Sequence, residues 1–259
     1  MARQGSDSPS GVRRRCVRWT SGWIDVHTMR LVAALLALLV SWPALTVAQS
    51  APPADAPIPA LPPTGGTVES FVPAEWTIEQ RHQADFNRDG RSDVLLLLRD
   101  NVAQGATPRR IVLVALATTQ PSGDVRSATN AQLVPRDLSG QLEDPMADGE
   151  ITVRPGGFDL RLGMMPATGS YLAATMRYRF RFEGGCFRLI GYDRAETHRG
   201  TLDTRDVSVN FLTGAVIRTT GNAQSGRSQN QRSRLTANPR RCLENLPSGW
   251  TFDPLAPSA

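Results

Sequence analysis

The chain has 259 residues with 29 arginines, no lysine and 24 acidic residues, which gives a formal net charge of +5. Six of the arginines and two of the acids lie in residues 1–48, so the remainder carries 23 basic and 22 acidic side chains. This near-neutral remainder argues against a nucleic-acid partner. The roughly 190 residues from Thr67 to the end suffice for one domain with a sizeable core.

Residues 1–48 have the pattern of a secretory leader. Arg30 precedes the apolar run "LVAALLALLV", Pro43 lies shortly after the run, and the small residue Ala48 ends the segment. A charged start, an apolar stretch of about 7–15 residues and a small residue at the cut site are typical of signal peptides. We expect cleavage after Ala48 and a periplasmic or secreted protein.

Alternatives for this leader stay open. Residues 31–48 are mostly apolar and nearly as long as the roughly 20 residues that span a bilayer, so an uncleaved anchor would tether the protein. The three arginines at 13–15 could belong to a twin-arginine signal, but they lie far from the apolar run. Both Met1 and Met29 are candidate starts.

The rest of the chain divides into a linker and one domain. Residues 49–66, "QSAPPADAPIPALPPTGG", are rich in Pro and Ala and cannot bury a core, so they are predicted to be an extended linker. Residues 67–259 are predicted to form a single mainly β domain of antiparallel sheets with hairpins. They contain no second linker, no apolar run long enough for a membrane span and no long amphipathic helix pattern.

Two early segments of this domain read as strands. The runs "RIVLVALAT" (110–118) and "EITVRPGGFDLRL" (150–162) are β-branched and apolar, and Pro and Gly punctuate them as turns do. Further along, "DVSVNFLTGAVIRTT" (206–220) predicts a hairpin with Thr213 and Gly214 at its turn. A short helix is predicted near "TANPRRCLENL" (236–246).

The segment "MRYRFRFEGGCFRLIGY" (176–192) predicts the clearest hairpin. Aromatic residues alternate with arginines, which is the period of a strand with one buried face. The glycines at 184 and 185 are expected to form the tight turn. The predicted register then pairs Phe182 with Phe187, Phe180 with Leu189 and Arg181 with Arg188.

Cys186 and Cys242 form the only possible disulfide once the leader, which contains Cys16, is removed. An oxidising compartment favours this bridge, and two buried free thiols are the alternative. Strict alternation places Cys186, Ile190 and Tyr192 on the outer side of the hairpin. A bridge would therefore strap the C-terminal segment across that outer side, provided that the register does not slip.

The stretch "ADFNRDGRSDVLLLL" (84–98) carries the one motif with chemistry. Its acids and amide match the spacing D-x-[DN]-x-[DN]-G-x-x-D, and Ca²⁺ binds six to eight such oxygens. Gly90 permits the sharp backbone reversal. The predicted Ca²⁺ ligands are the side chains of Asp85, Asn87, Asp89 and Asp93 and the carbonyl of Arg91. A plain Asp/Asn/Gly turn is the alternative.

This loop is not an EF-hand, because Leu96 occupies the twelfth position, where a bidentate Glu is required. Its spacing, followed by "VLLLL", resembles the calcium loops of FG-GAP and VCBS-type β-repeats. The loop occurs once, so a full propeller is not expected.

The resemblance covers most of the mature chain. The stretches "FVPAEWTIEQRHQADFNRDGRSDVLLLL", "EDPMADGEITVRPGGFDLRL", "YRFRFEGGCFRLIGYD" and "SVNFLTG" are similar to a family of exported bacterial proteins with a single loop of this kind. The resemblance implies an exported β protein, and it implies no reaction.

Three other features have ordinary interpretations. His82 lies three residues before the loop and could join a metal shell, but a surface histidine is the expectation. His198 has no accompanying nucleophile motif, so catalysis is not expected there. The arginines within 227–241 could bind a polyanion, yet the stretch lacks aromatic residues and is predicted to be a solvated loop.

Together these features predict an exported, calcium-stabilised binding or structural module of the cell envelope. Its ion would be structural, because the predicted ligands leave little open coordination for a substrate. The alternative function is a hydrolase of envelope polymers. Paired carboxylates or a perturbed histidine in a concave pocket would favour that enzyme, and a flat exposed patch would favour a binder. An envelope component is the candidate partner.

Overall fold

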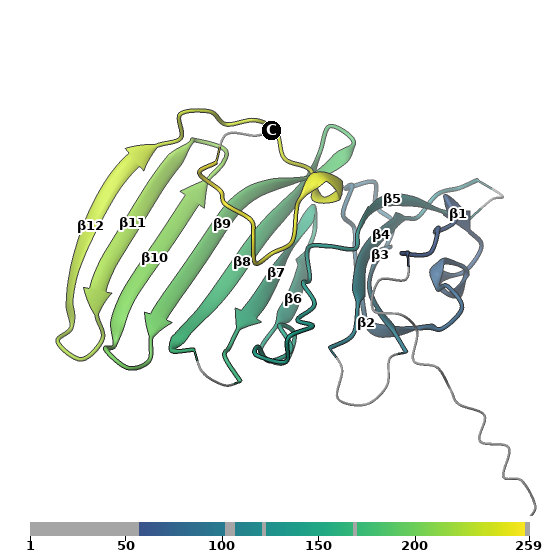
Figure 1. Ribbon diagram of the computed structural model, residues 1–259. Helices are drawn as coiled ribbons and strands as arrows, with labels where there is room; N and C mark the ends of the chain where they lie inside the picture. Colours follow the sequence, from purple (N-terminus) through teal and green to yellow (C-terminus); the bar gives the residue numbers. More distant parts are fainter. Residues whose placement is uncertain (1–56, 102–106, 121–122, 168–169, 257–259) are drawn as a thin grey trace, which may run out of the picture. The chain divides into compact units, whose positions relative to one another are not determined.

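The computed structural model describes residues 57–101, 107–120, 123–167 and 170–256, all of them within one compact unit, Ser50–Ala259. The predicted leader and the first part of the predicted linker lie outside the described residues. As predicted, the fold is mainly β, with two antiparallel sheets that do not close into a propeller (Figure 1). The described residues contain no α-helix.

The first sheet has five strands in the order β1-β5-β4-β3-β2. Its elements, with one short 3-10 helix, are β1 (Thr64–Gly65), η1 (Val68–Phe71), β2 (Trp76–Ala84), β3 (Asp93–Asp100), β4 (Arg110–Leu116) and β5 (Asp124–Asn130). Because β1 pairs with β5, the folded part begins before residue 67, inside the segment predicted to be a linker. Leu61, an apolar residue of the proline-rich segment, also packs against the core of this sheet.

The second sheet has seven strands in the order β12-β11-β10-β9-β8-β7-β6, so each strand pairs with its neighbour in sequence. Its strands, followed by a second 3-10 helix, are β6 (Glu150–Arg154), β7 (Gly157–Met164), β8 (Leu172–Glu183), β9 (Cys186–His198), β10 (Asp203–Asn210), β11 (Ala215–Asn222), β12 (Arg227–Arg234) and η2 (Leu243–Asn245). The predicted strands at 110–118 and 150–162 are confirmed, and the turn at Pro155 and Gly156 separates β6 from β7. The predicted hairpin at 206–220 is β10–β11.

β3 and β4 are buried on both of their faces, which explains the unbroken apolar runs of their sequences. Leu95 and Leu97 point into a core that they share with the seven-stranded sheet. Leu96 and Leu98 point the other way, into a smaller core closed by Phe71 of η1. The alternation of a strand thus supplies two cores from one apolar run.

A buried ion cluster joins this sheet to the segment before β6. The Arg110 guanidinium, with 2% of its side chain exposed, donates hydrogen bonds of 2.6–2.8 Å to both oxygens of Glu79 and of Asp144. Burial by itself disfavours the charge, but these acceptors raise the pKa of Arg110 overall. Glu79 reaches Arg110 from a bulge in β2, where it has no partner in β3.

The β8–β9 hairpin has the predicted register at its turn. Phe182 pairs with Phe187 and Phe180 with Leu189, and Arg181 faces Arg188. The two turn glycines have φ values of 57° and 79°. Positive φ at both central positions is the requirement of the type I′ turn, so the double glycine explains the hairpin.

One residue further along, the predicted alternation fails. Arg179 pairs with Gly191 and Phe180 pairs with Leu189, so Ile190 is an extra residue without a partner. Such a bulge moves every later side chain of β9 to the other face of the sheet. Tyr192 therefore pairs with Tyr178 and is fully buried, and its predicted place on the outer side is wrong.

We call the face of the seven-stranded sheet that carries Tyr178 and Tyr192 the inner face. The C-terminal segment, residues 241–256, passes over this face (Figure 1). The predicted disulfide between Cys186 and Cys242 is present, with Cα atoms 5.9 Å apart. The prediction that it straps the segment across the outer side is wrong, because Leu243, Leu246 and Phe252 are apolar and join the inner core.

Short contacts fix the start of this C-terminal segment. The Leu189 amide donates to the Arg241 carbonyl at 2.8 Å. The C-terminal segment therefore pairs with the part of β9 that lies beyond the end of β10. The buried side-chain amide of Asn130 donates to the backbone carbonyls of Leu243 and Leu246. The helix predicted near 236–246 is only the three-residue η2. No described helix is long and apolar enough to cross a membrane.

Replacing both cysteines tests the contribution of the disulfide. The bridge joins residues 56 positions apart, so Cys186→Ser with Cys242→Ser should lower the free energy of unfolding by about 4 kcal/mol if loop-closure entropy dominates. Urea denaturation under non-oxidising and oxidising conditions measures this loss. The parent protein with reductant should match the double variant, and equal midpoints for oxidised parent and variant would contradict the role of the bridge.

Candidate functional site

The predicted calcium loop connects β2 to β3. Asp85 follows the last residue of β2 and Asp93 begins β3, so the two acids stand at the two ends of the loop. Between them the backbone takes positive φ at Arg88 (62°) and Gly90 (87°), which reverses the chain tightly.

Side-chain oxygens fold inward onto the backbone of this loop. The Asp85 carboxylate accepts the amides of Asp89 at 3.0 Å and Gly90 at 2.9 Å. The Asn87 side-chain oxygen accepts the Asp89 amide at 3.0 Å, and Asp89 accepts the Arg91 amide at 2.9 Å. These bonds hold three predicted ligand side chains, those of Asp85, Asn87 and Asp89, in one turn.

Asp93 differs from the other acids of the loop because it is fully buried. Its carboxylate accepts backbone amides from Phe86 at 2.7 Å, Asn87 at 3.3 Å and Ala117 at 2.9 Å. Burial raises the pKa of Asp93, while the hydrogen bonds from Ala117, Phe86 and Asn87 oppose that rise. Asp93 therefore anchors the loop to the segment that follows β4, and a direct bond from it to a metal stays a prediction.

The loop also contacts the seven-stranded sheet. The Gly156 amide, in the β6–β7 turn, donates to the Asp85 carbonyl at 2.9 Å. The Phe86 ring packs edge-on against Phe158 and Phe187, with centroids 6.3 and 5.8 Å apart. The loop thus lies where the two sheets meet, so rigidity gained in it would be transmitted to both.

The donor set has the chemistry for Ca²⁺ but is not gathered around one point. All predicted ligands are oxygens, and a carboxylate keeps lone pairs free after accepting one or two amides. The Asp89 carboxylate, however, pairs with the Arg91 guanidinium at 3.1 Å. Within the described ranges no three acidic, histidine or cysteine side chains converge as a metal site would require. Calcium would have to displace Arg91 from Asp89.

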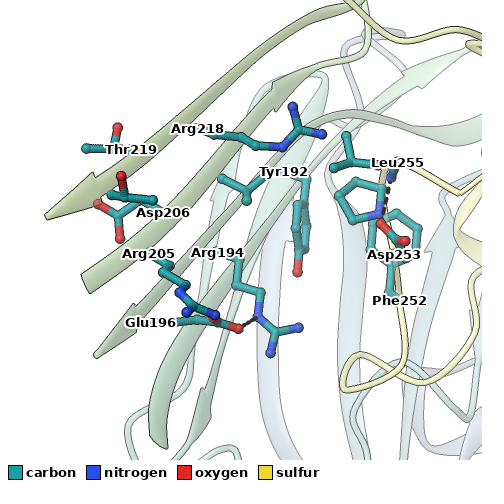
Figure 2. Close-up of a pocket in the computed structure, with 13 residues that line it drawn as sticks. Tyr192, Arg194, Glu196, Arg205, Asp206, Arg218, Thr219, Phe252, Asp253 and Leu255 are labelled. Atoms are coloured by element: carbon teal, nitrogen blue, oxygen red, sulfur yellow. Dashed lines mark hydrogen bonds and ion pairs between the residues drawn. The ribbon is translucent and has the colours of Figure 1, made fainter. Parts of the chain in front are cut away.

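A second candidate site is a cavity of about 340 Å³ on the inner face of the seven-stranded sheet. Strands β9, β10 and β11 form its floor, and residues 252–255 of the C-terminal segment form one wall (Figure 2). It begins where the buried core ends, because Tyr192 and Phe252 belong to both. Small-molecule sites typically start near 300 Å³.

Arginines surround this cavity in a defined register. Val207 of β10 pairs with Arg194 of β9 on one side and with Arg218 of β11 on the other. Arg205, two residues before Val207, faces the same way and pairs with Glu196 and Thr220. Figure 2 shows the guanidinium groups of Arg194, Arg205 and Arg218 around the cavity.

Tyr192 lies beneath the apolar floor of the cavity, and its hydroxyl is itself buried. Its ring meets Tyr178 and Phe252 with centroid distances of 5.1 Å each. Its buried hydroxyl lies beside Tyr178 and Arg194 but makes no hydrogen bond of ordinary geometry with either. Burial raises the pKa of Tyr192, so the hydroxyl keeps its proton and can donate.

The two histidines and the basic stretch singled out in the sequence make ordinary contacts within the fold. His82 is half-buried on β2 and lies 3.1 Å from the Gln80 side-chain oxygen, and burial lowers the pKa of His82. His198 stacks on Tyr171 and accepts the Thr201 amide at 3.0 Å. The arginines at 227–234 lie on strand β12, so the predicted solvated loop is wrong for them.

No family model, curated protein or solved structure matches the chain. The likeness to exported FG-GAP and VCBS-type proteins therefore stays a prediction.

Sequence reasoning missed the cavity because no short motif marks it. Its residues come from three strands and from the C-terminal segment. Tyr192, Arg194 and Glu196 alternate along one strand, so the sequence shows that they share a face of the sheet. A regular strand would place them on the outer face, and only the bulge at Ile190 brings them to the inner face.

The buried Asp93 should matter for stability whether or not calcium binds. Asp93→Ala leaves three backbone amides without their acceptor, so the free energy of unfolding should fall by about 2–4 kcal/mol. Urea denaturation in the presence of chelator measures this loss. The matched control Asp89→Ala, an exposed acid of the same loop, should cost less than about 1 kcal/mol. Equal losses would contradict the anchoring role of Asp93.

Proposed function

We propose that this chain is an exported, calcium-stabilised binding module of the cell envelope. The observation that carries the proposal is the extension of the seven-stranded sheet beyond its core. All eight residues of β12 are exposed, and β10 and β11 contribute only Val209 and Val216 as buried apolar side chains. These strands contribute few side chains to the core, so their main contribution is exposed surface.

The extension keeps polar side chains on both of its faces. On β12, Arg227, Arg232 and Arg234 stand among Ser, Gln and Asn residues. Charges on an edge strand prevent random pairing with other chains, so the extension stays soluble while its inner face remains open. The cavity lies on that inner face, between the core and the extension.

Calcium fits this proposal as a structural ion. The oxygens of Asp85, Asn87 and Asp89 would hold it, and the ion would neutralise acids that stand close together in one turn. The loop contacts both sheets through Phe86 and Asp93, so an ion there would stabilise the fold that presents the cavity. No ligand at the cavity would need to touch it.

The disulfide supports export. Disulfides persist in oxidising compartments and are rare in the reducing cytosol. The bridge from Cys186 to Cys242 holds the segment that forms one wall of the cavity, so a reducing environment would weaken that wall. The expected signal peptide agrees with the same location.

The alternative hydrolase lacks a specific observation in its favour. The described residues that line the cavity include no histidine. Of its three acids, Glu196 pairs with Arg194 at 2.5 Å, Asp253 accepts the Leu255 amide, and the Asp206 side chain alternates to the outer face. Paired carboxylates around a water, which polymer hydrolysis would use, are not what this lining offers. Binding is therefore the function that we propose.

Calcium should raise the thermal unfolding midpoint of the purified protein. A ligand that binds only the folded state stabilises it by about 2.7 kcal/mol at a hundredfold excess over Kd. For a domain of this size the midpoint should rise by roughly 5–10 °C. Fluorescence of Trp76 and Trp250 during heating, with Ca²⁺ and with chelator, gives the measurement.

Two variants make the calcium test specific. Asp89→Ala removes a predicted ligand and should abolish the calcium response. Asp137→Ala removes an acid from another polar turn, where it accepts the Ser139 and Leu142 amides, and should keep the response. Identical curves with calcium and with chelator in the parent protein would show that the loop is only a polar turn.

Binding to the envelope can be measured by sedimentation. The purified protein, mixed with washed envelope fragments of the organism that produces it, should sediment saturably and should be competed by excess unlabelled protein. No soluble sugar or peptide should appear with time. Protein that stays in the supernatant at every concentration would refute envelope binding, and steady release of fragments would instead support the hydrolase.

A further inference from the structure

The cavity on the inner face combines an apolar surface with two arginines, Arg205 and Arg218, that have no acid at ion-pair distance among the described residues. We infer that it binds an amphipathic anion, whose apolar group packs on Val207 and Leu255 above the buried rings of Tyr192 and Phe252 and whose carboxylate or phosphate pairs with Arg205 and Arg218. This inference deepens the proposed binding function and rests on it.

The apolar half of the site is preformed. Tyr192 is fully buried and Phe252 is 5% exposed, so these rings form a fixed layer beneath the cavity, and the half-buried Val207 and Leu255 supply the apolar surface that a ligand would touch. Val207, Pro254 and Leu255 line the same cavity. An apolar group placed here would leave water for a surface that the protein already holds in position, which favours binding through the hydrophobic effect.

The cationic half consists of three arginines around Val207. Arg194 and Arg218 are the cross-strand partners of Val207, and Arg205 lies two residues before it, opposite Glu196. A bound anion beside Arg205 and Arg218 would meet two cations that make no close ion pair among the described residues.

The acids near the cavity are already engaged or face elsewhere. Glu196 pairs with Arg194 at 2.5 Å. Asp253 accepts the Leu255 amide at 2.8 Å. Asp206 is also a lining residue, but it alternates with Arg205, which directs its side chain to the outer face. Asp203 accepts hydrogen bonds from Asn222 and Thr201, which together with the nearby Arg205 lower the pKa of Asp203.

Arg205 and Arg218 consequently have no acid at ion-pair distance within the part of the chain that the structure describes. Arg218 donates only to the Ser233 hydroxyl, at 3.1 Å. Guanidinium groups bind carboxylate and phosphate with two parallel hydrogen bonds, so these two side chains suit either head group.

The neighbourhood also orients the ligand. A second hollow, of about 740 Å³, adjoins the cavity and shares Arg205 and Thr220 with it. Its other lining residues are mostly polar, among them Asp203, Asn222 and Gln229. The shared arginine thus marks the boundary between an apolar and a polar region. The anionic group belongs at this boundary, the apolar group belongs in the cavity, and any polar extension belongs in the second hollow.

Isothermal titration with defined probes, below their micelle concentrations, tests the inference. Decanoate and decyl phosphate supply the two head groups on one apolar chain, decanol supplies the chain alone, and acetate supplies the anion alone. At least one of the two amphipathic anions should bind, and decanol and acetate should bind about tenfold more weakly or not at all. The comparison of decanoate with decyl phosphate identifies the preferred head group.

Variants locate the binding. Arg205→Gln and Arg218→Gln should each weaken binding of the amphipathic anion by about tenfold or more. The matched control is Arg232→Gln, an exposed arginine on the outer face of β12, which should change Kd by less than about twofold. All three variants should unfold near the parental midpoint, because Arg205 and Arg232 are exposed and Arg218→Gln loses only one exposed hydrogen bond, to the Ser233 hydroxyl.

Three results would overturn the inference. They are equal binding of decanol and the amphipathic anions, equal binding by Arg232→Gln and the two cavity variants, and no binding of either amphipathic anion. Each of these leaves the envelope sedimentation result standing, so failure of the ligand class is distinguishable from failure of the binding function.

Discussion

One extra residue in β9 determines which side chains face the core of the seven-stranded sheet. Ile190 has no partner in β8, and from that point the alternation of β9 is reversed. The reversal buries Tyr192 and places Arg194 and Glu196 on the inner face. Without it, the aromatic contact between Tyr178 and Phe252 would lose its third ring, and the cavity would lose its floor.

The buried rings in turn depend on the C-terminal segment. The Tyr178 hydroxyl donates to the Gly249 carbonyl at 2.9 Å, and Phe252 covers both tyrosine rings. The disulfide at Cys242 and the side chain of Asn130 hold the start of this segment. A covalent bond, buried hydrogen bonds and apolar packing therefore act together where the core ends and the cavity begins.

The two candidate sites have separate tasks in this arrangement. The loop from Asp85 to Asp93 lies where the two sheets meet and would act through stability. The cavity lies on β9–β11 and would act through recognition, because Arg205 and Arg218 make no close ion pair among the described residues. A structural ion and a separate ligand site are consistent with a module whose purpose is to present a surface.

The local features of the fold could be predicted from the sequence: the mainly β class, the β8–β9 turn from two glycines with positive φ, and the pairing of Phe182 with Phe187. Short-range sterics and strand periodicity govern all of these. The bridge between Cys186 and Cys242 could be predicted from the number of cysteines. The long-range features appear only in the folded chain: the C-terminal segment crosses the inner face, Asp93 is an anchor, and Arg205 and Arg218 share a cavity. Those outcomes depend on a bulge and on contacts between residues distant in sequence, and no local pattern encodes such contacts.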